Sequence, residues 1–232
     1  MSKNPERNME VREIRKRQIL DATLTAYIRF GYHGADMDIV AKEAGLAKGL
    51  VYYYYKTKQE LFAELFTQMF KDGYSFSENM IKNTDGFNPV EQLMAYAYGM
   101  FAANKDNPRM LQFFIRAPFD AYAVFTTDSR KDGALKSDMH RKALSNIIQK
   151  GIAEGLIPNT NPGMAANSFW SVFVANAFEY SKLIDGTQKP VEINKEEFKE
   201  TVCFCFQGLG IEHVVWNACL EKVVTEIKSG GQ

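Results

Sequence analysis

One stretch of the sequence decides the fold: Asp36-Met-Asp-Ile-Val-Ala-Lys-Glu-Ala-Gly-Leu-Ala-Lys-Gly-Leu-Val-Tyr-Tyr-Tyr-Tyr-Lys-Thr-Lys-Gln-Glu-Leu61. It begins with an apolar stripe that has the i, i+3, i+4, i+7 spacing of one helical face, formed by Met37, Val40, Ala41 and Ala44. Gly45 follows, where many helices end in a left-handed residue. A second short helix is expected at residues 48–54. This layout predicts a helix-turn-helix, which offers the first residues of its second helix to DNA bases. An ordinary helical hairpin is the alternative.

Helical periodicity continues through the rest of the chain, and we find no alternating strand pattern between hairpin turns. Asn88, Asn107 and Asn161 each precede a proline, which marks a helix start. Residues 57–60 form a capping box. The sequence therefore predicts an all-α fold, with helices at residues 10–31, 37–44, 48–54, 57–82, 89–104, 108–115, 119–126, 130–154, 162–184, 194–208 and 211–228.

The composition is that of a globular protein. Of the 232 residues, 46% are hydrophobic and 24% charged, with Lys+Arg and Asp+Glu equal at 28 each, which excludes disorder of the whole chain. The first thirty residues contain no secretory signal, and the most apolar stretch, residues 168–178, is too short to span a bilayer. We therefore expect a cytoplasmic protein with no membrane partner. The three cysteines lack metal-ligand spacing and are expected to be reduced.

The charge is distributed unevenly. Residues 1–60 hold eleven Lys or Arg against eight Asp or Glu, and the remainder has an acidic excess of the same size. Seven of these eleven basic residues gather at two places, namely Arg12, Arg15, Lys16 and Arg17, and further on Lys48, Lys56 and Lys58. An anionic partner could be touched at two separate points.

The stretch from Asp36 to Leu61 resembles the signature of the tetracycline-repressor-like (TetR) transcriptional regulators. Residues 19–32 are similar to that family's first helix and its glycine-aromatic exit. The resemblance implies a helix-turn-helix DNA-binding domain at residues 1–56 and a helical ligand-binding and dimerisation domain at residues 57–232. It also implies a homodimer, most often a repressor, that releases a palindromic operator in double-stranded DNA when a small-molecule effector binds.

Six residues match positions that contact DNA in this family: Lys48, Gly49, Leu50, Tyr52, Tyr53 and Lys58. Lys58 would reach a phosphate, Lys48 could reach a phosphate or a base, and Gly49 would let the backbone approach either. Leu50 would suit a thymine methyl, with a purely structural role as the alternative. Asp36 stands where the family commonly has threonine. Because its charge would repel a phosphate, we leave it out of the DNA contacts.

The chain is rich in aromatic residues, with 17 Phe, 11 Tyr and 2 Trp. We expect some of them to line an apolar cavity for a largely apolar or aromatic effector, where a charged residue without a protein partner would select the ligand. The residues expected to line it are Phe101, Phe113, Arg116, Phe119, Tyr122, Phe169, Phe173 and Glu179. For each aromatic residue an ordinary core role is the alternative, and for each charged residue a solvated position.

Two segments are apolar on more than one face: the predicted helix at residues 162–184 and the run from Val202 to Phe206. Burial on all sides is readily supplied by a dimer interface. We therefore expect a homodimer, and a charge at Phe173 or Phe206 should yield monomers or aggregates. The helix at residues 211–228 is expected to be an amphipathic addition, and the sequence assigns it no role.

No catalytic motif is present, and the three histidines are scattered over different predicted elements. We therefore expect no catalytic residue, no metal and no cofactor. The reading that fits best is a ligand-responsive transcriptional regulator. The alternatives are a helical small-molecule-binding protein or enzyme with a vestigial helix-turn-helix, and an interaction protein that acts through its C-terminal helix.

Overall fold

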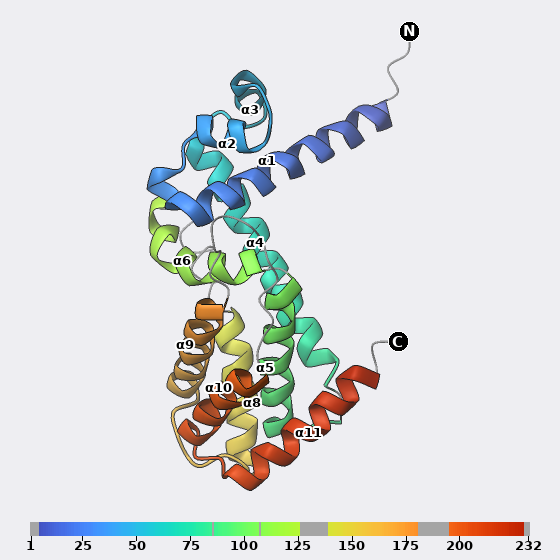
Figure 1. Ribbon diagram of the computed structural model, residues 1–232, viewed down its shortest axis with the longest axis vertical. Helices are drawn as coiled ribbons and strands as arrows, with labels where there is room; N and C mark the ends of the chain where they lie inside the picture. The colour runs from blue at the N-terminus through green and yellow to red at the C-terminus, as the bar shows by residue number, and fades with distance from the viewer. Residues whose placement is uncertain (1–4, 85, 107, 126–138, 181–194, 230–232) are drawn as a thin grey trace. The chain divides into compact units, whose positions relative to one another are not determined.

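The computed structural model describes residues 5–84, 86–106, 108–125, 139–180 and 195–229, which contain helices and no strand (Figure 1). For these residues the expected all-α fold is confirmed. They divide into two compact units. Unit 1 comprises the described residues of 5–70 and 112–125, and unit 2 those of 71–111 and 139–229. The functional boundary expected after residue 56 stays a prediction.

Unit 1 contains the helix-turn-helix. Its helices are α1 (Pro5–Gly34), α2 (Met37–Glu43), α3 (Lys48–Tyr54), the first part of α4 (Lys58–Lys82) and most of α6 (Pro108–Val124). Figure 1 shows α2 beside both α1 and α3, which it contacts. The core of the unit is a cluster of rings with centroids 4.9 to 6.1 Å apart, formed by Tyr27, Phe62, Phe66, Phe70 and Phe113.

A kink interrupts α1 at Gly31, three residues before the helix ends, and the Gly31 backbone takes the left-handed φ of 70°. The Arg116 guanidinium of α6 donates to two carbonyl oxygens just before this kink, at 3.0 Å from the Ile28 oxygen and 3.3 Å from the Tyr27 oxygen. Arg116 thus joins α6 to α1 beside the kink.

The two helices expected at residues 108–115 and 119–126 are one helix, α6, with Pro118 inside it. The prediction of a break was wrong. Proline has the φ of a helix and costs one backbone hydrogen bond. The neighbouring Phe113 and Ala117 are buried, and this packing keeps the helix continuous.

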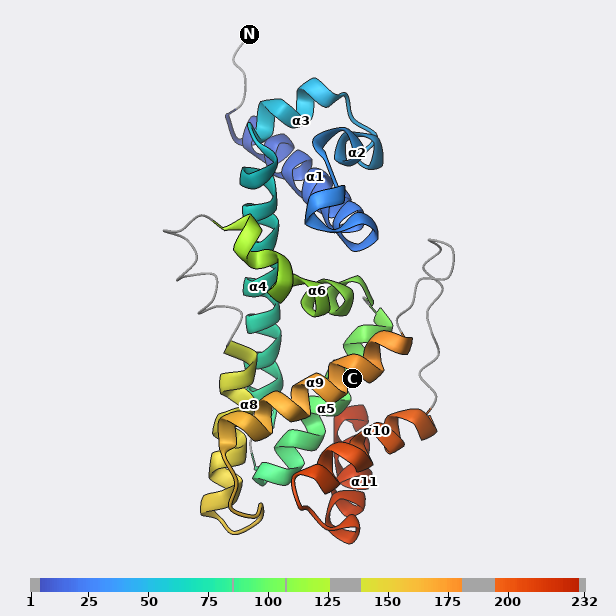
Figure 2. The same cartoon turned by 90° about the vertical axis from the view of Figure 1, so that its left-hand side faces the viewer.

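Unit 2 contains the rest of α4 together with α5 (Pro89–Asp106), α8 (Met139–Ala153), α9 (Pro162–Tyr180), α10 (Lys195–Gly208) and α11 (His213–Ser229) (Figure 2). The expected helix starts at Asn88 and Asn161 are confirmed. The Asn88 side chain accepts hydrogen bonds from the N–H groups of Val90 and Glu91, and the Asn161 side chain accepts one from that of Met164. Asn107 lies outside the described residues.

The core of unit 2 is also aromatic, and it includes Phe101, Phe169, Phe173, Phe198 and Phe206. The added helix α11 packs on α5. Its Trp216 is buried, and Lys222 makes a 2.9 Å ion pair with Glu91 of α5. Helix α11 is therefore part of this unit's packing.

The cysteines behave as small apolar residues, since Cys205 and Cys219 are buried, Cys203 is half-buried, and all three are free thiols. Burial raises the pKa of the Cys205 thiol to about 12. In the described part of the chain, no group of three or more His, Cys, Asp or Glu side chains could hold a metal ion. None of the described helices combines the length and apolar character needed to cross a bilayer.

Candidate nucleic-acid interface

The turn between α2 and α3 is built by local signals in the sequence. Asp36 caps α2, because its carboxylate accepts hydrogen bonds from the N–H groups of Asp38 at 3.0 Å and Ile39 at 2.8 Å. Gly45 takes the left-handed φ of 64° that ends α2. The N–H of Leu46 then donates to the Ala41 carbonyl at 2.9 Å. The chain is thereby turned so that α3 begins at Lys48.

Helix α3 has one closed side and one open side. Val51 is fully buried, and Tyr55 directly after the helix is buried as well. On the open side, Lys48 and Gly49 are exposed, Tyr52 and Tyr53 are 38% and 65% exposed, and Leu50 is half-buried. A side chain at Gly49 would meet no atom within 4 Å. The first turn of α3 is therefore open to an incoming partner.

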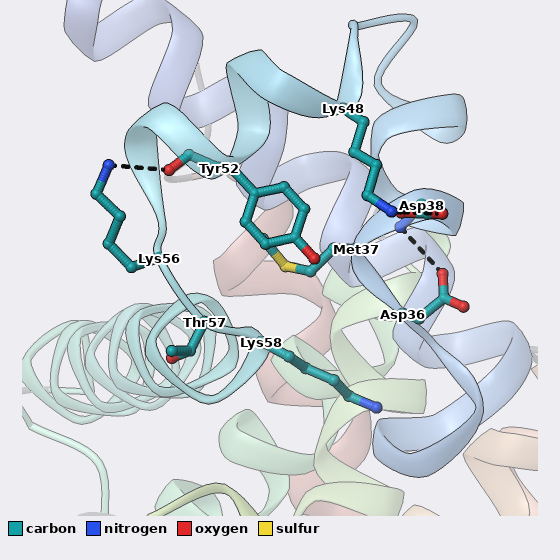
Figure 3. A pocket seen from close by; sticks show the side chains of 8 residues that line it. All are labelled: Asp36, Met37, Asp38, Lys48, Tyr52, Lys56, Thr57 and Lys58. Carbon is teal, nitrogen blue, oxygen red and sulfur yellow. Dashed lines mark hydrogen bonds and ion pairs between the residues drawn. The ribbon is translucent and has the colours of Figure 1, made fainter.

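An open depression of about 370 Å³ lies between the starts of α2, α3 and α4 (Figure 3). Its lining consists of Asp36, Met37, Asp38, Lys48, Tyr52, Lys56, Thr57 and Lys58. We call this surface the recognition depression. Three lysines and two aspartates leave it with a net charge of one positive. Such a surface suits an anionic partner.

Lys48 does not stand alone in the recognition depression. Its ammonium lies 2.6 Å from one carboxylate oxygen of Asp38 and 2.9 Å from the other (Figure 3). The ammonium is also 5.8 Å from the centroid of the Tyr52 ring. The hydrogen bond to Asp38 is the main cause that raises the pKa of Lys48. Lys48 therefore stays charged.

The other two lysines are held by backbone carbonyl groups. The Lys56 ammonium donates to the Tyr52 oxygen at 3.1 Å, at the end of α3. The Lys58 ammonium donates to the His33 oxygen at 3.2 Å and lies 4.7 Å from the centroid of the Tyr32 ring. Burial lowers the pKa of Lys58. Each of the three lysine ammonium groups is thus held in position by a hydrogen bond to a neighbouring residue.

The start of α4 differs slightly from the expected capping box. The Thr57 hydroxyl accepts a hydrogen bond from the Glu60 N–H at 3.0 Å, as expected. The Glu60 carboxylate accepts from the N–H of Lys56 at 2.8 Å, one residue before the cap. The connection between α3 and α4 is therefore fixed on both sides, which sets the position of Lys58.

The structure brings three of the six expected DNA contacts, Lys48, Tyr52 and Lys58, into the recognition depression. Gly49, Leu50 and Tyr53 belong to α3 but do not line it. Sequence reasoning grouped Lys56 with Lys48 and Lys58 as basic residues but did not count it among the DNA contacts, and it missed Asp38 as a member of the surface. A lysine just after a short helix was a usable signal for Lys56, because cations favour helix C-termini.

The residues expected to bind a ligand are divided between the two units. Phe113, Arg116, Phe119 and Tyr122 belong to the part of α6 in unit 1, and Phe101, Phe169 and Phe173 belong to unit 2. Phe113 is buried, whereas Phe119 and Tyr122 are exposed. Arg116 is bonded to α1, so the argument from an unpaired buried charge does not apply to it. The side chain of Glu179 lies outside the described residues. The ligand site stays a prediction.

A helix-turn-helix with a closed core, an open second helix and a positively charged depression at its start defines a DNA-binding protein. Residues 19–65 match the family model described as bacterial regulatory proteins, tetR family. Over these residues the chain is similar to the TetR family of transcriptional regulators. The chain is 27% identical over 169 residues to the uncharacterized HTH-type transcriptional regulator YhgD of Bacillus subtilis. The matched residues make up 72% of this chain and 85% of that protein.

Solved structures share the fold. AibR in complex with isovaleryl coenzyme A and operator DNA has a TM-score of 0.62 at 18% identity, over 82% of this chain and 97% of that one. FadR from Bacillus subtilis in complex with stearoyl-CoA has a TM-score of 0.61 at 18% identity, over 83% of this chain and 98% of that one. The same all-α fold is thus found in proteins of known structure.

Proposed function

We propose that this protein is a TetR-family repressor, which binds operator DNA as a homodimer and releases it when a small-molecule effector binds. The observation that carries the proposal is the recognition depression, where Lys48, Tyr52 and Lys58 share one open, positively charged surface at the start of α3 and α4. The protein acts by binding rather than by catalysis, and it acts in the cytoplasm, where it meets chromosomal DNA.

The homodimer is supported by apolar side chains that unit 2 leaves exposed. On α10, Phe204 is 65% exposed between the buried Val202 and Phe206. On α9, Met164 is exposed, and Ser168 and Ser171, two exposed residues further along the helix, are small. Exposed apolar side chains beside small residues suit a closely packed partner helix. A two-fold dimer requires an operator with two half-sites about one helical turn, or a multiple, apart.

The DNA-binding function is tested by selection from a library of random DNA duplexes with the full-length protein. Gel shifts then compare the selected duplex, the protein's own upstream DNA and a scrambled duplex. We expect an imperfect palindrome, bound by two protomers. The DNA-binding function is contradicted if no sequence is enriched, and this result would favour the vestigial helix-turn-helix or the interaction protein. A monomer that binds one half-site tightly would contradict the homodimer instead.

The effector that we propose is a compound with a large apolar part. AibR and FadR, in the structures named above, hold isovaleryl coenzyme A and stearoyl-CoA. The aromatic residues Phe101, Phe169 and Phe173 give unit 2 an apolar interior of matching character. Acyl-coenzyme A thioesters of increasing chain length are therefore the first compounds to test.

The switch is tested by calorimetric titration of these thioesters with and without the selected duplex. Thermodynamic linkage requires that DNA lower the affinity of the protein for the effector by the same factor by which the effector lowers its affinity for DNA. We expect tighter binding in the absence of DNA. A compound that binds with equal affinity in both titrations is not the inducer.

A further inference from the structure

The ion pair between Lys48 and Asp38 joins α3 to α2 at the surface expected to meet DNA. The side chains are 57% and 60% exposed. Exposed ion pairs contribute little to the stability of a fold. A purely stabilising role therefore gives a weak reason for a carboxylate at the entrance of the recognition depression.

A carboxylate at this position opposes the attraction of DNA phosphates. Each contact between a lysine and a phosphate adds to affinity without regard to sequence, and it makes binding more sensitive to salt. Asp38 lies within 2.9 Å of the Lys48 ammonium and offsets its charge, and Asp36 lines the same depression. Binding that does not depend on sequence is therefore weaker than three lysines alone would give.

The same carboxylate restricts where the Lys48 ammonium can lie. A lysine has a flexible four-carbon stem, so its ammonium is normally poorly fixed. Here the two carboxylate oxygens of Asp38, on α2, contact the Lys48 ammonium. The centroid of the Tyr52 ring, on α3, lies 5.8 Å from the same ammonium. Figure 3 shows the Lys48 stem running from the first residue of α3 to Asp38. In helix-turn-helix proteins the N-terminal residues of the second helix contact base edges. An ammonium has three donors, and guanine O6 and N7 are its usual acceptors in the major groove.

We propose that Asp38 is a specificity-determining residue of the DNA interface. It positions Lys48 for a guanine and lowers the affinity of the protein for DNA of any sequence. Asp38 is a positioning residue, because it selects a base through Lys48. The inference rests on the DNA-binding function proposed above.

The test compares the full-length wild-type protein with Asp38→Asn, which keeps the size of the side chain and removes its charge. Binding is measured on the duplex selected by the wild type and on a scrambled duplex, at several salt concentrations. For Asp38→Asn we expect about 3- to 10-fold tighter binding to the scrambled duplex and a salt slope steeper by about one unit. Affinity for the selected duplex should rise less, so that the ratio of the two affinities falls by about threefold or more.

Glu43→Gln is the matched control. Glu43 is also on α2 and also forms an exposed ion pair, with Arg29 at 3.5 Å, but it does not line the recognition depression. This variant removes the same charge from the same helix. Its ratio of affinities should stay close to the wild-type ratio.

A double-mutant cycle with Lys48→Ala separates positioning from repulsion. In the Lys48→Ala background, Asp38→Asn should strengthen binding to both duplexes alike and leave the ratio unchanged. Selection with Lys48→Ala should also lose a guanine that the wild type enriches. The inference is overturned if Asp38→Asn keeps the wild-type ratio, or if the ratio falls equally without Lys48. A wild-type protein that selects no sequence would instead overturn the DNA-binding function itself.

Discussion

The hydroxyl of Tyr27 in α1 donates a 2.9 Å hydrogen bond to the carboxylate of Asp120 in α6. Burial, together with the negative charge of Asp120, raises the pKa of Tyr27 far above its ordinary value, so the hydroxyl keeps its proton. Arg116, one turn earlier on α6, holds the carbonyl oxygens of Tyr27 and Ile28. The part of α6 in unit 1 is thus attached to α1 by directed hydrogen bonds as well as by ring packing.

Replacing Tyr27 by phenylalanine tests this attachment. Tyr27→Phe keeps the buried ring and removes the donor, so the free energy of unfolding should fall by about 1 kcal/mol. Because the folded-state pKa is raised, wild-type stability should also decrease above about pH 10, and this decrease should be shallower in the variant. Thermal and urea unfolding measure both effects. Tyr53→Phe, at a largely exposed position, is the control, and equal stability of the two variants would contradict the prediction.

Gly49 allows a test that separates folding from DNA binding. Since nothing lies within 4 Å of an added methyl group, Gly49→Ala should stabilise α3 by about 0.5–1 kcal/mol through its higher helix propensity. The same methyl group would stand in the path of the DNA, and affinity for the selected duplex should fall about tenfold, or 1.4 kcal/mol. Anisotropy and thermal unfolding measure the two quantities.

Gly45→Ala is the matched variant, because Gly45 is also free of neighbours but has a left-handed φ. It should destabilise the unit by about 1 kcal/mol. If Gly49→Ala binds the selected duplex as tightly as the wild type does, the backbone at this position does not approach DNA.

Lys58→Met removes the charge and keeps most of the stem that lies beside Tyr32 and Phe62. If the ammonium contacts a phosphate, binding to selected and scrambled duplexes should weaken alike, and the salt slope should fall by about one unit. The melting temperature should not fall, because a partly buried charge is lost. Lys71→Met, at an exposed position further along α4, is the control. A wild-type salt slope for Lys58→Met would remove Lys58 from the interface.

The dimer is best tested at Phe204. Phe173 and Phe206 are the positions at which the sequence suggested charged substitutions. These side chains are 1% and 0% exposed in unit 2, so a charge there would unfold the unit. Phe204→Asp should instead give a folded monomer, measured by light scattering and circular dichroism. Phe206→Asp serves as the contrasting variant and should lose helical signal. A Phe204→Asp protein that remains a dimer would place the interface elsewhere.

The sequence was informative wherever a structural feature depends on neighbouring residues. The cap at Asn88 and the turn at Gly45 are set by a few consecutive positions, and both were predicted. The pairing of Asp38 with Lys48 depends on how α3 crosses α2, which no local pattern contains. The continuity of α6 through Pro118 likewise depends on packing outweighing a local preference. Arg116 was expected to meet a ligand, and its partners on α1 are 88 and 89 positions away.

The kink at Gly31 couples the residues that positions 31 and 116 can accept. A methyl group added at Gly31 would lie 3.2 Å from the central carbon of the Arg116 guanidinium, and the φ of 70° disfavours any side chain there. Shortening Arg116 would make room, but it would leave the backbone conformation unfavourable and would remove the hydrogen bonds from Arg116 to the Tyr27 and Ile28 carbonyl groups. A library that varies both positions should therefore return glycine at 31 almost regardless of residue 116. Second-site suppressors of Gly31→Ala at position 116 should be rare and should restore stability only in part. A redesign of the protein should therefore keep Gly31.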